Sequence, residues 1–174
     1  MEQRSRAHGA LLFLLWSTFL ILMGVIIYLS IQDGIAAKEQ MYKIVEYLQE
    51  YTEVDLKAKL GIATGDKDQI AYLLRQSGRV AAFFLLGILG TVSVHMTFKK
   101  MNWFAKTCIT SFALVAIAYC TEKIKEYLPT RHFSREEMLF SIMAVVLGFL
   151  LVSAVTLLYH LIKCTVRLIA RCHN

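Results

Sequence analysis

Four long stretches of this sequence are almost free of charge, and each is close to the length that a helix needs to cross a membrane. They cover about 10–30, 80–97, 104–121 and 138–162, with Lys106 as their only formally charged residue. The hydrocarbon core of a bilayer is roughly 30 Å thick, which about 20 apolar residues span as a helix. Backbone groups in lipid have no water to bond, so such spans form helices. We therefore predict an all-α fold, a four-transmembrane-helix bundle.

The composition agrees with a membrane protein. Hydrophobic residues make up 57% of the 174 residues and charged residues only 18%, whereas a soluble domain carries about 25% charged residues. The length is that of one domain, so we predict a single integral membrane domain over 1–174. A basic start before the first apolar run is also typical of a signal peptide. This run is longer than the roughly 7–15 residues of a signal core, and we interpret it as a retained span.

The basic residues beside the spans predict how the chain is oriented. Four spans place both termini and the connector 98–106 on one side of the membrane. The side that holds most Lys and Arg in its short segments is normally cytoplasmic, so we predict cytoplasmic termini and extracytoplasmic loops over 31–79 and 122–137. The basic residues of the loop 122–137 argue against this orientation. On the predicted cytoplasmic side lie Arg4, Arg6, Lys99, Lys100, Lys106, Lys163, Arg167 and Arg171, against Glu2.

The first predicted loop contains a helical pattern of its own. Met41, Ile44, Val45 and Leu48 repeat at helical spacing and would form one apolar face. We predict short amphipathic helices in this loop. They either lie on the surface of the membrane or the bundle, or form a lid over an outward cavity, and the sequence leaves both interpretations open.

The sequence shows no pattern typical of a metal, cofactor or nucleic-acid site. The four cysteines form no CxxC pair and have no zinc-like spacing with the histidines near the C-terminus, so we interpret them as packing residues or free thiols. The net charge of +6 comes mainly from residues that flank the spans, which sets topology rather than binding nucleic acid. No HExxH or Ser-x-x-Lys motif occurs, so the sequence favours a protein that is not an enzyme.

Small residues in two of the spans predict a close helix contact. Gly87, Gly90 and Ser93 follow one another at helical spacing in the second span, and Gly148 and Ser153 lie in the fourth. Small side chains allow the backbones of two membrane helices to approach each other. For both sets we expect close packing against another helix, rather than a cavity.

The connector between the third and fourth spans is the most charged part of the chain near a span. It reads "TEKIKEYLPTRHFSREE" from Thr121 onward and contains the only proline. Pro129 has no N–H and restricts the residue before it, so we predict that the third helix ends there. Glu122 and Lys125 have the spacing of an i, i+3 pair on a helix.

Three charged residues of this connector are candidates for a site. If the chain turns at the proline, Arg131 and Glu137 return beside Glu122 at one end of the bundle. An arginine between two carboxylates can clamp the helices together, or it can hold the phosphate of a lipid-linked substrate. Acid–base catalysis is a third interpretation, and the residues leave all three open.

The order of the motifs along the chain resembles the VanZ-like family of small membrane proteins. The pattern of that family after the third span is an acid, Glu, two variable residues, Gln, three variable residues, Pro, one variable residue and Arg. Glu122, Pro129 and Arg131 match this pattern, Ser134 and Glu137 follow at the right spacing, and small residues continue into the last span.

Two further stretches carry the resemblance. The first span ends in "SIQDG", where Ser30 and Gln32 resemble a Ser-x-Gln motif, and "LRQSGRVAAFF" resembles the stretch that carries Arg-Lys, His-Phe and Glu-Tyr before the second span. The chain also departs from the family pattern. Arg79 takes the place of the histidine, while the other departures are Thr121 for an acid, Lys125 for glutamine, Ala82 for glutamate and Phe83 for tyrosine.

The resemblance implies a protein of the bacterial cytoplasmic membrane, in a family whose founding member is associated with low-level resistance to the glycopeptide teicoplanin. It implies a cell-envelope protein that alters drug access to, or the handling of, lipid-linked wall precursors at the outer face. Its partners would be membrane lipids, the glycopeptide or the precursor. An enzyme acting on a polyprenyl-phosphate-type lipid is the alternative, and the oligomeric state stays open. The candidate binding residues are Glu122, Arg131, Glu137, Ser134, Gln32 and Arg79.

Overall fold

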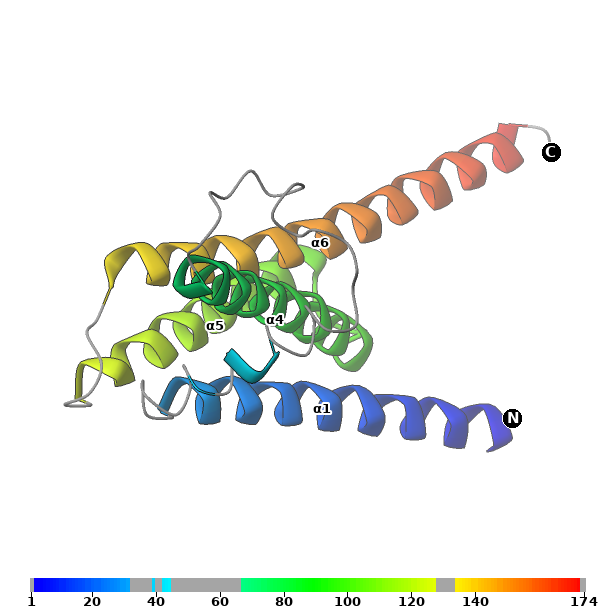
Figure 1. The fold of residues 1–174 in the computed structure, drawn as a ribbon. Helices are drawn as coiled ribbons and strands as arrows, with labels where there is room; N and C mark the ends of the chain where they lie inside the picture. Colours follow the sequence, from blue (N-terminus) through cyan, green and yellow to red (C-terminus); the bar gives the residue numbers. More distant parts are fainter. Residues whose placement is uncertain (1, 32–38, 40–41, 45–66, 128–133, 173–174) are drawn as a thin grey trace, which may run out of the picture.

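The structure is a computed structural model that describes residues 2–31, 39, 42–44, 67–127 and 134–172. All elements within these ranges are helical, so the predicted all-α fold is confirmed. They are α1 (Glu2–Ile31), α4 (Lys67–Thr97), α5 (Trp103–Lys123), the 3-10 helix η1 (Ile124–Tyr127) and α6 (Arg135–Cys172), as Figure 1 shows. Most of the loop predicted over 31–79 lies outside the described residues, and its end belongs to α4.

Four of the helices are long and apolar enough to cross a membrane, and the chain is therefore a multi-pass membrane protein. Helix α1 begins, and helix α6 ends, at the same end of the bundle, as an even number of spans requires (Figure 1). Large apolar side chains such as Phe13 and Phe112 point outward, where lipid replaces water as the solvent. The candidate spans are His8–Ile31, Tyr72–Thr97, Trp103–Tyr127 and Arg135–Val166.

Helices α4 and α6 share the most extensive contact in the bundle, and it depends on two glycines. A Cβ atom at Gly87 would collide with the backbone carbonyl of Val145, and one at Gly148 would collide with that of Phe84. No side chain fits between backbones at this separation. The close packing expected at Gly87 and at Gly148 is found, and the structure shows that the two spans are each other's partners.

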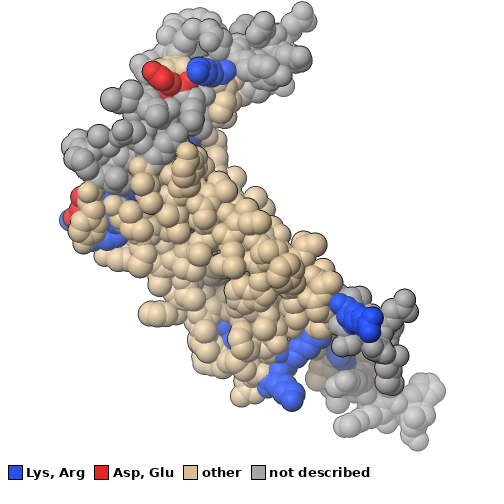
Figure 2. All heavy atoms as spheres, turned by 90° about the horizontal axis from the view of Figure 1, so that it is seen from below, with Lys and Arg blue, Asp and Glu red and all other residues tan. Residues whose placement is uncertain are grey.

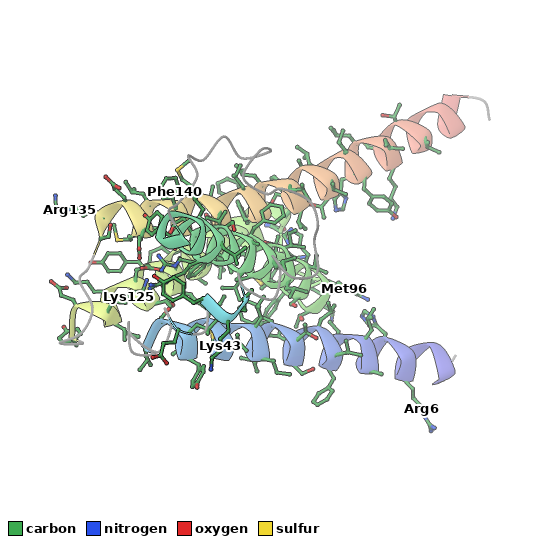
Figure 3. The ribbon with its side chains drawn as sticks, in the orientation of Figure 1. Arg6, Lys43, Met96, Lys125, Arg135 and Phe140 are labelled. Atoms are coloured by element: carbon green, nitrogen blue, oxygen red, sulfur yellow. The ribbon has the colours of Figure 1, made fainter. Side chains whose placement is uncertain are left out.

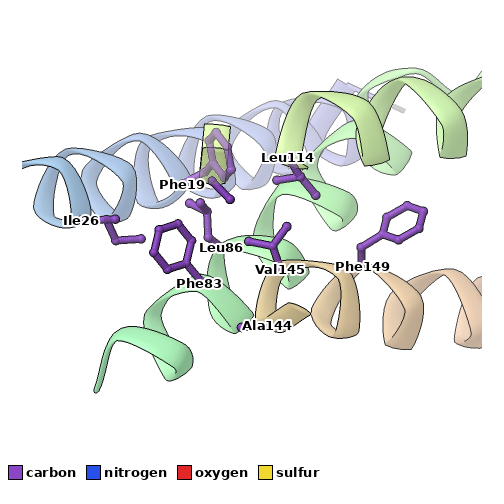
Figure 4. Packing of buried hydrophobic residues seen from close by; sticks show 9 residues of the cluster. Phe19, Ile26, Phe83, Leu86, Leu114, Ala144, Val145 and Phe149 are labelled. Carbon is purple, nitrogen blue, oxygen red and sulfur yellow. The ribbon is translucent and has the colours of Figure 1, made fainter. Parts of the chain in front are cut away.

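The apolar core lies in the middle of the bundle and joins all four long helices (Figure 4). Gly90 leaves room for it, because a Cβ atom there would lie 2.9 Å from Cδ2 of Leu114 and 3.0 Å from Cε2 of Phe19. The second span thus uses small residues on two faces, toward α6 and toward α1 and α5. The buried residues of this core cluster are Phe19, Ile26, Phe83, Leu86, Leu114, Ala118, Ala144, Val145 and Phe149.

The C-terminal part of α6 leaves the bundle. Figure 1 shows it diverging from the other helices, and all side chains of residues 157–166 are exposed. The half of α6 that packs is therefore the one that begins at Arg135, next to the charged connector.

Candidate functional site

The end of the third span has a local geometry that creates an ion pair. Helix α5 ends at Lys123, and η1 continues as a 3-10 helix to Tyr127, two residues before Pro129. Residues three apart lie directly above one another in a 3-10 helix. Lys125 lies in this turn and Glu122 lies three residues earlier in the last turn of α5, and the pair predicted from their spacing is confirmed.

This inner pair is buried. Glu122 is 1% exposed and Lys125 is 2% exposed, and Figure 3 shows Lys125 inside the bundle, at the opposite end from Arg6. The second oxygen of Glu122, Oε1, lies 3.1 Å from Oγ of the fully buried Ser141, which donates to it. The same hydroxyl lies 3.0 Å from the backbone carbonyl of Glu137. Hydrogen bonds of this kind are what allow a buried ion pair to remain charged.

An outer pair joins helices α4 and α6. Arg79 donates from Nη1 to Oε2 of Glu137, and their side chains are 12% and 21% exposed. Lys125 connects the two pairs, because its Nζ lies 3.5 Å from the same oxygen of Glu137. We call these five residues, contributed by α4, α5, η1 and α6, the charged cluster: Arg79, Glu122, Lys125, Glu137 and Ser141.

The charged cluster contains more positive than negative charge once Arg75 is included. Arg75 lies one helical turn before Arg79, and its charge also acts on Glu137. Two carboxylates thus face three cationic groups. The excess lies at the half-buried outer pair, whereas the inner pair is closed to solvent, so the reachable part of the cluster suits an anionic ligand.

The predicted site residues fall into three groups. Glu122, Glu137 and Arg79 belong to the charged cluster. Ser134 lies just before α6, where its carbonyl accepts the N–H of Met138 at 3.2 Å. Gln32 and Arg131 lie outside the described residues, so the predicted place of Arg131 between the two carboxylates stays a prediction. Among the described residues, Lys125 occupies that place.

Two members of the cluster were not predicted as site residues. Lys125 differs from the glutamine of the family pattern, although its spacing from Glu122 signals the pair. Ser141 lies four residues after Glu137 and therefore on the same face of α6, which is the signal that could have identified it. Its approach to Glu122 depends on how α5 and α6 pack.

Other kinds of site find little support in the part of the chain that the structure describes. That part contains no group of three or more His, Cys, Asp or Glu residues that could hold a metal ion. Cys108, Cys120 and Cys164 are free thiols there, and all three are exposed.

Comparison of the chain with protein-family models, with curated proteins and with solved structures finds no match. Function must therefore be inferred from the geometry of the charged cluster and from the order of the motifs along the chain.

Proposed function

We propose that this chain is a VanZ-like protein of the bacterial cell envelope. In this proposal the charged cluster binds the phosphate-bearing head group of a lipid-linked wall precursor at the outer face of the cytoplasmic membrane. Binding there alters the access of teicoplanin to the precursor and gives low-level resistance. The observation that carries the proposal is the meeting of positions from two separate motif stretches in one cluster, since Arg79 comes from one stretch, Glu122 and Glu137 come from the other, and all three lie on different helices.

The chemistry of the outer pair supports a phosphate ligand. An arginine presents a planar fork of donors that matches the oxygens of a phosphate, and Arg79 is half-buried beside the additional charge of Arg75. A charge in such a place is screened less than one in water. The cluster also lies at the ends of the spans, where lipid head groups are found, so a lipid ligand can reach it by diffusion within the membrane.

The distribution of charge supports an outward position for the cluster. In Figure 2 the coloured charges at one end of the molecule are all Lys and Arg, whereas toward the other end Asp and Glu side chains lie beside Lys and Arg. By the positive-inside rule, the end at which the described charged side chains are all Lys and Arg, which we call the basic end, faces the cytoplasm. The charged cluster then lies on the extracytoplasmic side, where lipid-linked wall precursors are used.

Binding is favoured over catalysis because the inner groups of the cluster are closed to a substrate. An enzyme acting on a polyprenyl-phosphate needs a reachable nucleophile or base. The hydroxyl of Ser141 is fully buried, and the two oxygens of Glu122 are engaged by Lys125 and Ser141. Within the described cluster, only the outer pair is open to a ligand.

The test is drug susceptibility of a sensitive Gram-positive host that produces the full chain. Wild type should raise the inhibitory concentration of teicoplanin more than that of vancomycin, and Arg79→Gln should abolish this effect. Lys123→Gln is the matched control, because Lys123 pairs with Glu126 on the exposed surface beside the cluster. Membrane levels are compared by immunoblotting.

Two results would contradict the proposal. Wild type could leave teicoplanin susceptibility unchanged at a verified membrane level. Alternatively, Arg79→Gln could protect the host from teicoplanin as well as wild type does, which would show that the charged cluster is not needed for resistance. Binding of undecaprenyl phosphate to purified wild type and Arg79→Gln in nanodiscs then separates loss of ligand from loss of a later step.

A further inference from the structure

Helix α4 carries two arginines on one face, at the end of the bundle that holds the charged cluster. Arg75 and Arg79 are four residues apart and are therefore neighbours on the surface of the helix. The candidate span begins at Tyr72, so both arginines lie close to the membrane interface. Side chains of a helix tilt toward its N-terminus, and both guanidinium groups therefore extend toward this interface, where lipid head groups are found.

The two arginines differ in whether they are paired. Arg79 donates to Glu137, whereas Arg75 forms no hydrogen bond or ion pair with any residue that the structure describes. The side chain of Arg75 is only half-buried, so a ligand can reach it. Its charge nevertheless acts on Glu137, which places it beside the outer pair. Arg75 thus offers up to five N–H donors that have no described acceptor.

Arg79 can also turn to a ligand, because its partner has a second cation. Nζ of Lys125 lies 3.5 Å from the same oxygen of Glu137 that Arg79 binds. If a phosphate oxygen replaces this carboxylate on Arg79, Glu137 keeps its interaction with Lys125. A carboxylate left without any cation in a half-buried place would be costly. The arrangement avoids this cost, so both arginines are available to one anion.

We propose that Arg75 and Arg79 together bind the two phosphates of a polyprenyl diphosphate, so that the site selects lipid diphosphates over lipid monophosphates. This inference rests on the function proposed above and names the chemical class of its ligand. Each guanidinium fork matches the oxygens of one phosphate. Four residues of helix separate the two arginines by about 6 Å along its axis, and the phosphates of a lipid diphosphate likewise follow one another outward from the chain. Arg79 lies deeper and takes the phosphate next to the lipid chain, and Arg75 takes the outer phosphate.

The experiment compares the binding of undecaprenyl phosphate and undecaprenyl diphosphate to the purified full chain in phosphatidylcholine nanodiscs. Wild type should bind the diphosphate about tenfold more tightly, the contribution of one hydrogen bond to a charged group. Arg75→Gln should remove this preference by weakening diphosphate binding, and Arg79→Gln should weaken the binding of both lipids. Arg135→Gln is the matched control and should keep the preference. Arg135 is exposed and lies at the same end of the bundle as Lys125 (Figure 3).

The outcomes separate this inference from the proposed function. A wild type that binds both lipids equally would overturn the inference and leave the proposed phosphate binding intact, whereas a wild type that binds neither would contradict both. Equal losses of diphosphate affinity in Arg75→Gln and Arg135→Gln would also overturn it, because any arginine at this end would then suffice.

Two further measurements complete the test. Inorganic diphosphate, at the same concentration as the lipid, should displace little of it, and full displacement would identify a soluble anion as the ligand and overturn the inference. Size-exclusion chromatography checks the fold of each variant. If Arg75→Gln does not fold, Arg75→Lys, which keeps the charge but loses the planar fork, must narrow the preference for the diphosphate, or the inference fails.

Discussion

The two ends of the bundle differ in whether their buried charged side chains are paired. In the charged cluster, Glu122, Lys125, Arg79 and Glu137 are paired with one another across three helices. At the basic end, Lys106 is almost as deeply buried but has no partner among the described residues. Charged groups within membrane spans are costly and usually face the interior of the bundle or a ligand. The charged cluster compensates its charges with groups of the same chain, whereas Lys106 has no compensating group among the described residues.

This difference shows which charges hold the fold together. Paired charges from separate helices fix the positions of those helices relative to one another. An unpaired charge adds nothing to the contact between helices. Substitutions at the two ends should therefore differ in their effect on stability, and four predictions, in order of expected effect, test this difference.

The largest effect is expected when the inner pair loses one partner. Lys125→Met leaves Glu122 buried without its cation and should lower the free energy of unfolding by roughly 3–5 kcal/mol. The measurement is the melting temperature of the detergent-solubilised protein, with size-exclusion chromatography as the readout of unfolding. The double variant Glu122→Leu/Lys125→Met should be more stable than Lys125→Met alone. A double variant that is less stable would show that the ion pair itself stabilises the fold, beyond avoiding an unpaired buried charge.

The outer pair should contribute less because it is half-buried. Arg79→Ala removes a charged hydrogen bond to Glu137 and should lower the free energy of unfolding by about 1.5–3 kcal/mol. Lys123→Ala is the control, since exposed pairs such as that of Lys123 and Glu126 contribute little. The same melting assay compares the two variants. Equal losses would mean that burial does not distinguish these pairs.

The next effect is expected at the contact between α4 and α6, which lies between the two ends of the bundle. Gly148→Ala places a methyl group against the backbone of Phe84, and such overpacking typically costs about 1–3 kcal/mol. Gly24→Ala meets no atom within 4 Å and should leave stability unchanged or slightly raised. Thermal unfolding of both variants in the same detergent checks this. A tolerated alanine at Gly148 would show that α4 and α6 can separate without loss.

The smallest effect is expected at the basic end. Lys106→Met keeps the apolar stem and removes a charge that has no described partner, so stability in neutral detergent should change by less than about 0.5 kcal/mol. A loss as large as that of Lys125→Met would reveal a partner for Lys106 and end the contrast between the two ends. Chemical unfolding in a detergent without anionic lipid is the suitable measurement.

Much of the fold could be predicted from the sequence because lipid permits so few solutions. The four apolar runs mark the spans, and Gly87 and Gly148 mark places of close packing, although the sequence does not show that these two spans pack against each other. The helix boundaries in the structure differ more from the predicted spans. Helix α1 begins at Glu2 and α6 continues to Cys172, because polar and basic residues are also good helix formers and a helix need not end at the membrane surface.

The charged cluster was predicted only in part. Glu122, Glu137 and Arg79 follow from the order of the motifs. The role of Lys125 depends on a 3-10 turn, and that of Ser141 depends on the packing of α5 against α6. The turn at Lys125 is local to the chain, whereas the contact of Ser141 with Glu122 arises from the way in which two separate helices meet.

The length of α6 gives the glycine contact a mechanical consequence. At 1.5 Å per residue, the arm of α6 from Arg135 to Gly148 is about 20 Å long, and the arm from Gly148 to Cys172 is about 36 Å long. The helix is continuous over both arms, and Gly148 lies at its tightest contact with α4. Any tilt of α6 about this point moves its two ends in opposite directions, and the C-terminal end travels about 1.8 times as far. A displacement of Glu137 on one side of the membrane is therefore accompanied by a larger displacement of the C-terminal end of α6 on the other side.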